Sequence, residues 1–466
     1  MADAKTRGEE LKAKLFMDKQ NMGLSKDEEY LEKADLFAEG YKSFINMCKT
    51  EREVYDTTIS IAREKGYKEF DMAKEYKAGD KIYVGNMGKA LILATFGKKP
   101  LNEGTRIVAS HIDNPRLDLK PQPVFEKEEV GYFKTHYYGG IKKYQWPTLP
   151  LAIHGVVILN DGRTVDVKIG ESECDPVFVI SDILPHLAQD QMKRNASEII
   201  KGEELNVIVG SLPFKDDKAS EKVKLNVLRL IFEKYGITEE DFVSAELCMV
   251  PANMSRDVGF DRSLIGGYGH DDRCCAYPSI MAEVEAKEPE YTTICVLADK
   301  EEVGSDGRTG LNSRMLEYFI EDLAENAKVS YREVMRNSYC LSSDVGAAFD
   351  PTFPDCFEKN NSAKLNYGPI ITKYTGARGK SGTNDAPAEV VGFVRKLLND
   401  NGVQWQTGEL GKIDLGGGGT VAKFVGALQI KTIDMGVPVL SMHSPFEIIS
   451  KTDLYETFRA YEAFLK

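Results

Sequence analysis

Four apolar segments of this chain each lead directly into residues that commonly bind metal ions. In chain order, the segments and the residues that follow them are Arg106–Ser110 before His111, Tyr291–Leu297 before Glu301 and Glu302, Ser338–Ser343 before Asp344, and Val437–Met442 before His443. Short runs of apolar and β-branched residues are typical of buried strands. Because ligands bind beyond the carboxyl ends of strands in an open α/β sheet, we expect these four ends to meet at one rim.

A fifth segment supplies another carboxylate. Gly266–Arg273 (GGYGHDDR) is a glycine-rich turn before a helical run at Cys274–Glu285, and it places Asp271 on a loop. Glu301 and Glu302 are adjacent in a turn, so their side chains point in different directions. One could bind a metal while the other handles the proton of a metal-activated water. The alternative is that the pair belongs to a solvated charged loop.

The donor set favours particular metals. Two histidines with several carboxylates and no cysteine suit Zn, Co or Mn, and a bridging carboxylate suits two ions about 3.5–4 Å apart. Asp113 lies two positions beyond His111, where it can accept a hydrogen bond from the imidazole and fix its tautomer. The pattern therefore predicts a site for divalent metal ions.

The order of expected elements defines the fold class. Residues 1–66 show helical spacing, with one apolar stripe and a possible capping box at Thr50–Glu53. A β-rich unit occupies 121–250 and includes a helix around Asp182–Met192. After Val250, strands and helices alternate, which favours parallel strands. We predict an α/β fold in which helices flank a mixed sheet, with a catalytic domain of residues 1–120 and 251–466 and an inserted domain of residues 121–250.

Charge, apolar run length and cysteine spacing argue against several classes of protein. The formal net charge is −13, which argues against a nucleic-acid partner or an anionic membrane. No apolar run reaches the ~18 residues needed to span a bilayer. The charged N-terminal segment has no apolar signal region, and the eight cysteines form no CxxC motif. We therefore expect a cytoplasmic protein with neither a membrane anchor nor a disulfide scaffold.

Five motifs together carry a family resemblance. SHIDNPRLDLKP, GHDDRCCAY, DKEEVGS, SSDVG and VLSMHSPFE occur in this order between about Phe44 and the C-terminus. The chain resembles the family of aspartyl aminopeptidase and aminopeptidase I, which are dinuclear zinc exopeptidases. It is closer to the aminopeptidase I branch, because its glycine-rich segment IDLGGGGTV lacks the Pro and Cys of aspartyl-specific relatives.

The resemblance implies a role for each candidate residue. His111, Asp271 and Asp344 would bind one zinc ion, and Asp271, Glu302 and His443 the other. Glu301 would be the general base that serves a metal-activated water, and Asp113 would orient His111. His186 corresponds to a family position that reaches the neighbouring subunit's active site and stabilises the oxyanion. In chain order, the eight candidate site residues are His111, Asp113, His186, Asp271, Glu301, Glu302, Asp344 and His443.

The resemblance also implies activity and assembly. The enzyme would remove N-terminal residues from peptide substrates, the inserted β-rich unit would be a dimerisation domain, and dimers would build a tetrahedral dodecamer. Two alternatives remain open, namely another dimetal amide hydrolase (a deacylase or carboxypeptidase) on the same scaffold and a non-catalytic metal-bearing assembly.

A glycine run suggests a rival kind of site. Gly417, Gly419 and Ala422 satisfy the G-x-G-x-x-A pattern of dinucleotide sites after a short strand expected at Lys412–Leu415. The βαβ unit that should open such a domain is missing. We favour instead a role for these backbone amides in lining the substrate pocket.

Overall fold

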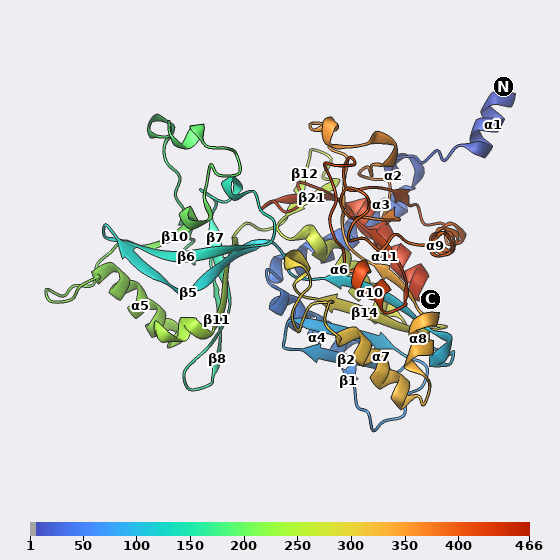
Figure 1. The fold of residues 1–466 in the computed structure, drawn as a ribbon, viewed down its shortest axis with the longest axis horizontal. Coiled ribbons are helices and arrows are strands. Elements are labelled where there is room, and N and C mark those ends of the chain that lie inside the picture. The colour runs from blue at the N-terminus through green and yellow to red at the C-terminus, as the bar shows by residue number, and fades with distance from the viewer. Residues whose placement is uncertain (1–5) are drawn as a thin grey trace.

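The computed structural model describes residues 6–466 and arranges them around three β-sheets (Figure 1). A nine-stranded mixed sheet forms the centre of the larger lobe. In spatial order its strands are β1 (Lys68–Glu69), β2 (Lys81–Asn86), β3 (Ala90–Thr95), β14 (Thr292–Ala298), β4 (Thr105–His111), β15 (Tyr339–Ser342), β19 (Lys431–Gly436), β17 (Ile370–Thr372) and β18 (Gln406–Thr407). The predicted α/β fold class, with helices flanking a mixed sheet, is confirmed.

Helices cover both faces of this sheet, as the alternation of its side chains requires. Leu91 and Leu93 of β3 join one apolar core, and Ile92 and Ala94 join the core on the other face. The first core includes residues of α3 (Glu28–Met47), α4 (Glu51–Glu64), α6 (His270–Glu285) and α11 (Lys451–Leu465). The second includes residues of α7 (Met315–Asn326), α8 (Tyr331–Asn337) and α10 (Ala422–Ala427). A further cluster forms around α9 (Ala388–Asp400).

The N-terminal helices begin where the sequence indicates. α1 (Arg7–Leu15) has no buried residue and α2 (Met22–Ser25) is a single turn. α3 buries the predicted apolar stripe against α6 and α11. The predicted capping box is present at the start of α4, where the Thr50 side chain accepts from the Glu53 amide and Glu53 accepts from the Thr50 amide. Local sequence therefore determines this helix start.

Residues Arg116–Pro251 build a separate seven-stranded sheet with its own apolar core. Its strands in spatial order are β8 (Thr164–Ile169), β7 (Leu151–Ile158), β11 (Ala245–Pro251), β5 (Arg116–Lys127), β6 (Val130–Tyr138), β10 (Asn206–Gly210) and β9 (Val179–Ile180). α5 (Lys222–Tyr235) packs against it. Figure 1 shows this inserted unit projecting to the left of the larger lobe, in cyan and green.

The helix predicted around Asp182–Met192 is wrong. That segment contains two short 3₁₀ turns, Pro185–Leu187 and Gln191–Lys193, within otherwise irregular chain. Leu184 is extended, with φ −65° and ψ 152°. A residue before proline is disfavoured in helical conformation, so no helix runs from Asp182 through Leu184, and Pro185 begins the first 3₁₀ turn.

A third, five-stranded sheet corrects another expectation. It contains β12 (Arg256–Val258), β13 (Leu264–Gly267), β21 (Glu447–Ser450), β20 (Pro438–Leu440) and β16 (Gly346–Ala347), in that spatial order. The strand before His443 is β20, so the prediction that all four strands share one sheet is wrong for the last one. The central strand β19 ends at Gly436, and Pro438 has no backbone N–H with which to continue its ladder.

Buried ion pairs join the inserted unit to the larger lobe. Arg116 Nη1 lies 2.6 Å from Glu51 Oε2, and His154 Nδ1 lies 2.8 Å from Glu53 Oε1. Both partners lie in the first turn of α4, so one helix start anchors the unit at two points. Within the described range 6–466, no helix has the length and apolar character needed to cross a membrane.

Candidate metal centre

Parallel strand ends bring the first candidate residues together. β4 pairs in parallel with β14 on one side and β15 on the other, with Ser110 opposite Leu297 and Ala109 opposite Ser342. Because parallel strands finish at the same edge, the residues that follow them meet there. His111 is the last residue of β4, Glu301 and Glu302 lie in a 3₁₀ turn after β14, and Asp344 follows β15.

The third sheet brings the remaining two residues to the same place. β13 pairs with β21, so that Gly267 lies opposite Glu447, and the turn carrying Asp271 meets the loop carrying His443. Gly269 has φ +82°, and a Cβ there would lie 2.5 Å from Arg273 Nη1, so the turn requires glycine. The Asp271–Asp272 peptide bond is cis.

Asp271 lies between the two histidines. Its Oδ1 is 3.1 Å from His111 Nε2, and its Oδ2 is 3.1 Å from His443 Nε2. Glu302 Oε2 lies 3.4 Å from His443 Nε2, and Asp344 Oδ1 lies 3.8 Å from His111 Nε2. One carboxylate therefore faces two imidazoles, and each imidazole has a second carboxylate nearby.

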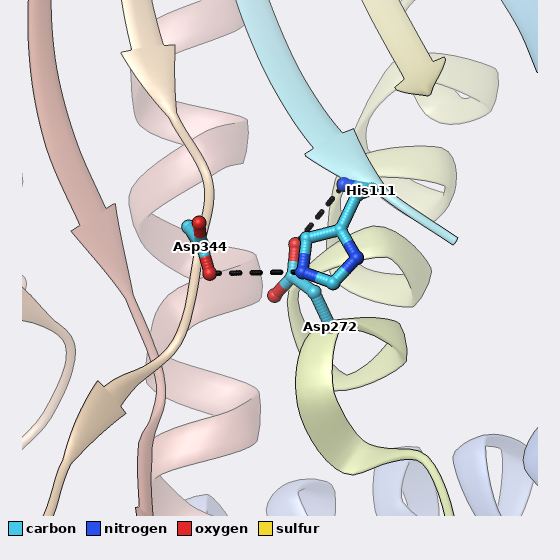
Figure 2. Close-up of side chains that lie close together, drawn as sticks. All are labelled: His111, Asp272 and Asp344. Atoms are coloured by element: carbon cyan, nitrogen blue, oxygen red, sulfur yellow. Dashed lines mark hydrogen bonds and ion pairs between the residues drawn. The ribbon is translucent and has the colours of Figure 1, made fainter. Parts of the chain in front are cut away.

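Two sets of three side chains in residues 6–466 bring one potential ligand atom each to within 4.8 Å of one another. The first comprises His111, Asp271 and Glu302, and the second comprises His111, Asp272 and Asp344. Figure 2 shows the second set, with Asp344 and Asp272 approaching His111 from separate elements. Asp272 was not among the residues singled out from the sequence, although it follows Asp271 directly in the GHDDR motif.

Burial of so many carboxyl groups perturbs their ionisation. Burial raises the pKa of Glu301 to about 7. Burial and the nearby Asp271 raise the pKa of Glu302 well above its ordinary value, and burial and Glu301 do the same for Asp344. Desolvation and like charge both disfavour the ionised form of an acid. Additional positive charge would therefore stabilise this cluster in its ionised state.

The histidines are affected in the opposite direction. Burial alone would lower the pKa of His111, but hydrogen bonds to Asp113 and Asp271 raise it well above 6.5. Burial also opposes the shift at His443, where the contact with Asp271 raises the pKa to about 10. In the protein alone, protons on the imidazoles thus compensate part of the negative charge that a metal cation would otherwise neutralise.

The donor atoms fit zinc. Imidazole nitrogens and carboxylate oxygens are ordinary zinc ligands. Glu302 Oε1 is buried without a hydrogen-bond partner, and the same holds for Asp272 Oδ1. Buried polar atoms are normally paired, so orphaned oxygens beside two histidines are consistent with positions for cations.

A buried Asp113 holds one side of the cluster. Its Oδ1 lies 3.3 Å from His111 Nδ1 and accepts from the Glu301 amide at 3.1 Å. Its Oδ2 accepts from the Glu302 amide at 3.2 Å and from the Tyr138 hydroxyl at 2.8 Å. Tyr138 belongs to the inserted unit, and no sequence pattern indicated its contribution. Asp113 therefore fixes an imidazole and the turn carrying both glutamates.

The other side also contains residues that sequence analysis missed. Glu447 accepts from the amides of His443 and Asp271, and Asn114 Nδ2 donates to the Asp271 carbonyl at 2.6 Å. The carbonyl of Gly140 lies 2.9 Å from His443 Nδ1. Glu447 and Asn114 both lie within the quoted motifs VLSMHSPFE and SHIDNPRLDLKP, and that position was the available signal.

A cavity of about 480 Å³ opens onto the cluster. Five of the candidate residues line it, together with the glycine loop Gly417–Gly419 and Glu409. The expected strand at Lys412–Leu415 is absent, since that segment consists of turns, and the helix after the loop, α10, is only six residues long. The glycines thus border the cavity from an irregular loop. The candidate residues at the wall are Asp271, Glu301, Glu302, Asp344 and His443.

His186 lies elsewhere. It is exposed in the 3₁₀ turn Pro185–Leu187 of the inserted unit and is not among the residues that line this cavity in the single chain. His270, the neighbour of Asp271, is buried with its Nδ1 2.7 Å from the Tyr41 hydroxyl. Seven of the eight candidate residues therefore gather in one place, and His186 does not.

Comparisons with known proteins establish the family. The profile of the aminopeptidase I zinc metalloprotease (M18) family matches residues 44–465. A probable M18 family aminopeptidase 1 from Clostridium acetobutylicum is 50% identical, over 94% of this chain and 96% of its own length. The chain belongs to this family, as the motifs predict.

Solved structures of related proteins support the same family assignment. The crystal structure of an M18-family aminopeptidase from Thermotoga maritima has a TM-score of 0.93 at 44% identity and covers 97% of this chain and 100% of its own. Aminopeptidase I from Clostridium acetobutylicum gives a TM-score of 0.91 at 47% identity, with the same coverage. The protein is a metal-dependent aminopeptidase of the aminopeptidase I branch, so this prediction is confirmed and the alternative classes are set aside.

Proposed function

We propose that the cluster binds two zinc ions and that Asp271 bridges them. The observation that carries this proposal is the position of the Asp271 carboxylate, whose two oxygens each lie 3.1 Å from a different histidine. His111 and Asp344 would complete one site, and His443 and Glu302 the other. When bound, the two ions supply Lewis-acid activation of the scissile carbonyl and of a water molecule.

Glu301 acts as the general base. Both Glu301 and Glu302 line the cavity, but Glu301 Oε2 lies 3.8 Å from His111 Nε2, whereas Glu302 Oε2 lies 3.4 Å from His443 Nε2. The Glu301 carboxylate takes a proton from the attacking water and delivers it to the nitrogen of the leaving amine. Asp113 keeps Glu301 in place by accepting from its backbone amide. Asp113 also fixes the His111 tautomer, because His111 Nδ1 lies 3.1 Å from the Asp113 carbonyl oxygen and 3.3 Å from its Oδ1.

The substrate's free N-terminus accounts for exopeptidase specificity. Asp271, Glu302 and Asp344 would be zinc ligands, so the free α-amine of the substrate would lie on one ion or beside the carboxylate of Glu301. An internal peptide bond has no such group to place there. Removal of N-terminal residues from peptides would follow from this requirement for a free amine.

The inserted unit would form the subunit interface and supply His186 to a neighbour. Four apolar side chains around His186 are 45–68% exposed in the single chain, namely Ile183, Leu184, Leu187 and Met192. Exposed apolar groups clustered on one loop favour burial against another subunit. Across that interface, His186 would donate to the substrate's carbonyl oxygen. We infer a homo-oligomer in which dimers assemble into a tetrahedral dodecamer.

A reducing compartment suits the cysteines. All eight are free thiols, and six of them are buried. Disulfides are rare in the cytoplasm, where thiols stay reduced, so we propose a cytoplasmic location.

Zinc titration of the metal-free protein tests the assignment. Wild type should bind two equivalents per chain, and His443→Ala should bind one, because only one of the two proposed sites loses its histidine. His136→Ala is the control, since His136 is exposed on the inserted unit, and it should still bind two. Saturation of wild type at one equivalent would contradict the two-ion proposal.

A further inference from the structure

A buried glutamate connects the two turns that carry Asp271 and His443. Glu447 is the first residue of β21, lies opposite Gly267 of β13, and is 1% exposed. Its Oε1 accepts from the backbone N–H of His443 at 2.7 Å. Its Oε2 accepts from the backbone N–H of Asp271 at 3.1 Å. One side chain thus bonds to the main chain of two residues that are 172 positions apart in the sequence.

Both turns depend on such support because their backbone is irregular. His443 has φ +64°, a conformation that residues other than glycine seldom adopt. Asp271 has φ −78° and ψ 105°, which is not helical although the residue lies in the first turn of α6. Neither amide lies in a strand ladder. The carboxylate therefore provides a fixed point for two loops that sheet pairing does not hold.

The chemistry of the side chain explains why the residue is a glutamate. A carboxylate accepts through both oxygens, and each Glu447 oxygen faces one backbone N–H. Glutamine has the same shape but would turn an NH₂ group toward one of the two amides. Asp113 makes a similar pair of contacts to the amides of Glu301 and Glu302 on the opposite side.

We propose that Glu447 is a positioning residue, which sets the distance between Asp271 and His443 and so determines the affinity of the metal site they share. The inference rests on the proposed function, because it assumes that these two side chains bind one ion. Glu447 itself does not touch the metal or the substrate in this account. Because Asp271 also contacts His111, loss of the Glu447 contacts should weaken both ions, and the ion held by Asp271 and His443 should weaken more.

The test compares Glu447→Gln and Glu447→Ala with a matched control, Glu283→Gln. Glu283 is also a fully buried glutamate. It lies near the C-terminal end of α6, the helix whose first turn carries Asp271, and it accepts hydrogen bonds from Tyr67 and Thr95 rather than from the cluster. Zinc affinities are measured by chelator competition, and Co²⁺-substituted protein reports the coordination geometry through its absorption spectrum.

We expect Glu447→Gln to bind one of its two ions about 10- to 100-fold more weakly, the usual effect of removing an outer hydrogen bond to a ligand. Glu447→Ala should lose at least as much, with an altered Co²⁺ spectrum. Glu283→Gln should match wild type in both measurements, whatever its effect on stability. Affinities for Glu447→Gln within twofold of the control would overturn the inference.

Two further measurements keep the outcome decisive. If His443→Ala binds both ions as tightly as wild type, the metal assignment fails, whereas a loss in His443→Ala with none in Glu447→Gln refutes only the role of Glu447. If the Glu447 variants do not fold, hydrogen exchange of metal-free wild type replaces them. The amides of Asp271 and His443 should then be protected, and exchange at the rate of open loops would overturn the inference.

Discussion

The two lobes of this molecule contain cavities with opposite kinds of lining. The larger lobe has a cavity of about 480 Å³ whose wall carries four carboxylates and a histidine from the candidate centre. The inserted unit has a cavity of about 520 Å³ beneath α5, lined mainly by apolar side chains such as Phe133, Ile153 and Phe178.

Burying like charges costs folding free energy, so the larger lobe retains its cluster for chemistry. The inserted unit exposes a group of apolar side chains around His186, which favours association. In the proposed account, reaction therefore belongs to the larger lobe and assembly to the inserted unit, with His186 as the link between them.

Removing the proposed base should have the largest effect. Glu301→Gln is expected to lower kcat by roughly two to four powers of ten, the usual contribution of a general base. Zinc content and substrate affinity should remain near those of wild type, because Glu301 is not a proposed ligand. Steady-state kinetics with metal analysis measures both.

A matched charge removal in the other lobe provides the control. Glu233 borders the apolar cavity and pairs with Arg229 on α5, so Glu233→Gln should leave kcat unchanged. Metal-depleted Glu301→Gln protein would show that Glu301 and Glu302 have exchanged roles. An equal loss of kcat in Glu301→Gln and Glu233→Gln would contradict the assignment of the chemistry to the larger lobe.

The proposed link predicts the next largest effect. His186→Ala should lower kcat by about 10²–10³, the usual effect of losing one oxyanion donor. Mixing it with Glu301→Gln under subunit exchange should restore roughly a quarter of wild-type activity, because one site in each mixed pair is complete. If exchange is verified and activity stays absent, His186 serves no neighbour.

The acidic cavity should also select among substrates. Outside the candidate centre, Glu409 is the charged residue that lines it, and no lysine or arginine of the described chain does so. Peptides that begin with Asp or Glu should therefore have kcat/KM values about tenfold below those that begin with Leu, since like charges repel. Glu409→Gln should bring the kcat/KM values for the two kinds of peptide closer together. Faster cleavage of acidic substrates would contradict this account of the cavity.

The junction between the lobes should respond to pH. His154 is buried between Glu53 and Glu171, whose hydrogen bonds raise its pKa although burial alone would lower it. A raised folded-state pKa means that this stabilisation is complete below the unfolded value of about 6.5 and disappears as pH rises through the folded value.

His154→Gln should accordingly lower Tm by about 2 °C at pH 6 and by less at pH 9. Thermal unfolding at both pH values measures the difference. His136→Gln is the control, since His136 is exposed, and it should have no effect at either pH. A deficit that grows with pH would contradict the assignment of a charged His154.

Sequence reasoning succeeded where local pattern determines position. His111, Glu302 and Asp344 follow strands whose ends meet because parallel pairing aligns them, and apolar runs reveal such strands. It failed at the helix expected around Asp182–Met192, where Pro185 disfavours a helical Leu184 and the chain beyond forms two short 3₁₀ turns. The change of sheet before His443 was equally invisible, since pairing partners depend on the rest of the fold.

The supporting contacts were beyond prediction for a related reason. Tyr138 reaches Asp113 from a different sheet, and Glu447 meets Asp271 across the β13–β21 pair. Such hydrogen bonds depend on the relative placement of distant segments. Residue type and spacing therefore identify the proposed ligands but not the residues that hold them in place.

Anomalous diffraction at the zinc edge from zinc-loaded crystals tests the central claim most directly. We predict two peaks about 3.5–4 Å apart, the usual separation in such centres, with Asp271 between them and one histidine beside each. His111 and Asp344 should flank one peak, and His443 and Glu302 the other. A single peak, or two peaks that share Asp272 instead of Asp271, would contradict the account.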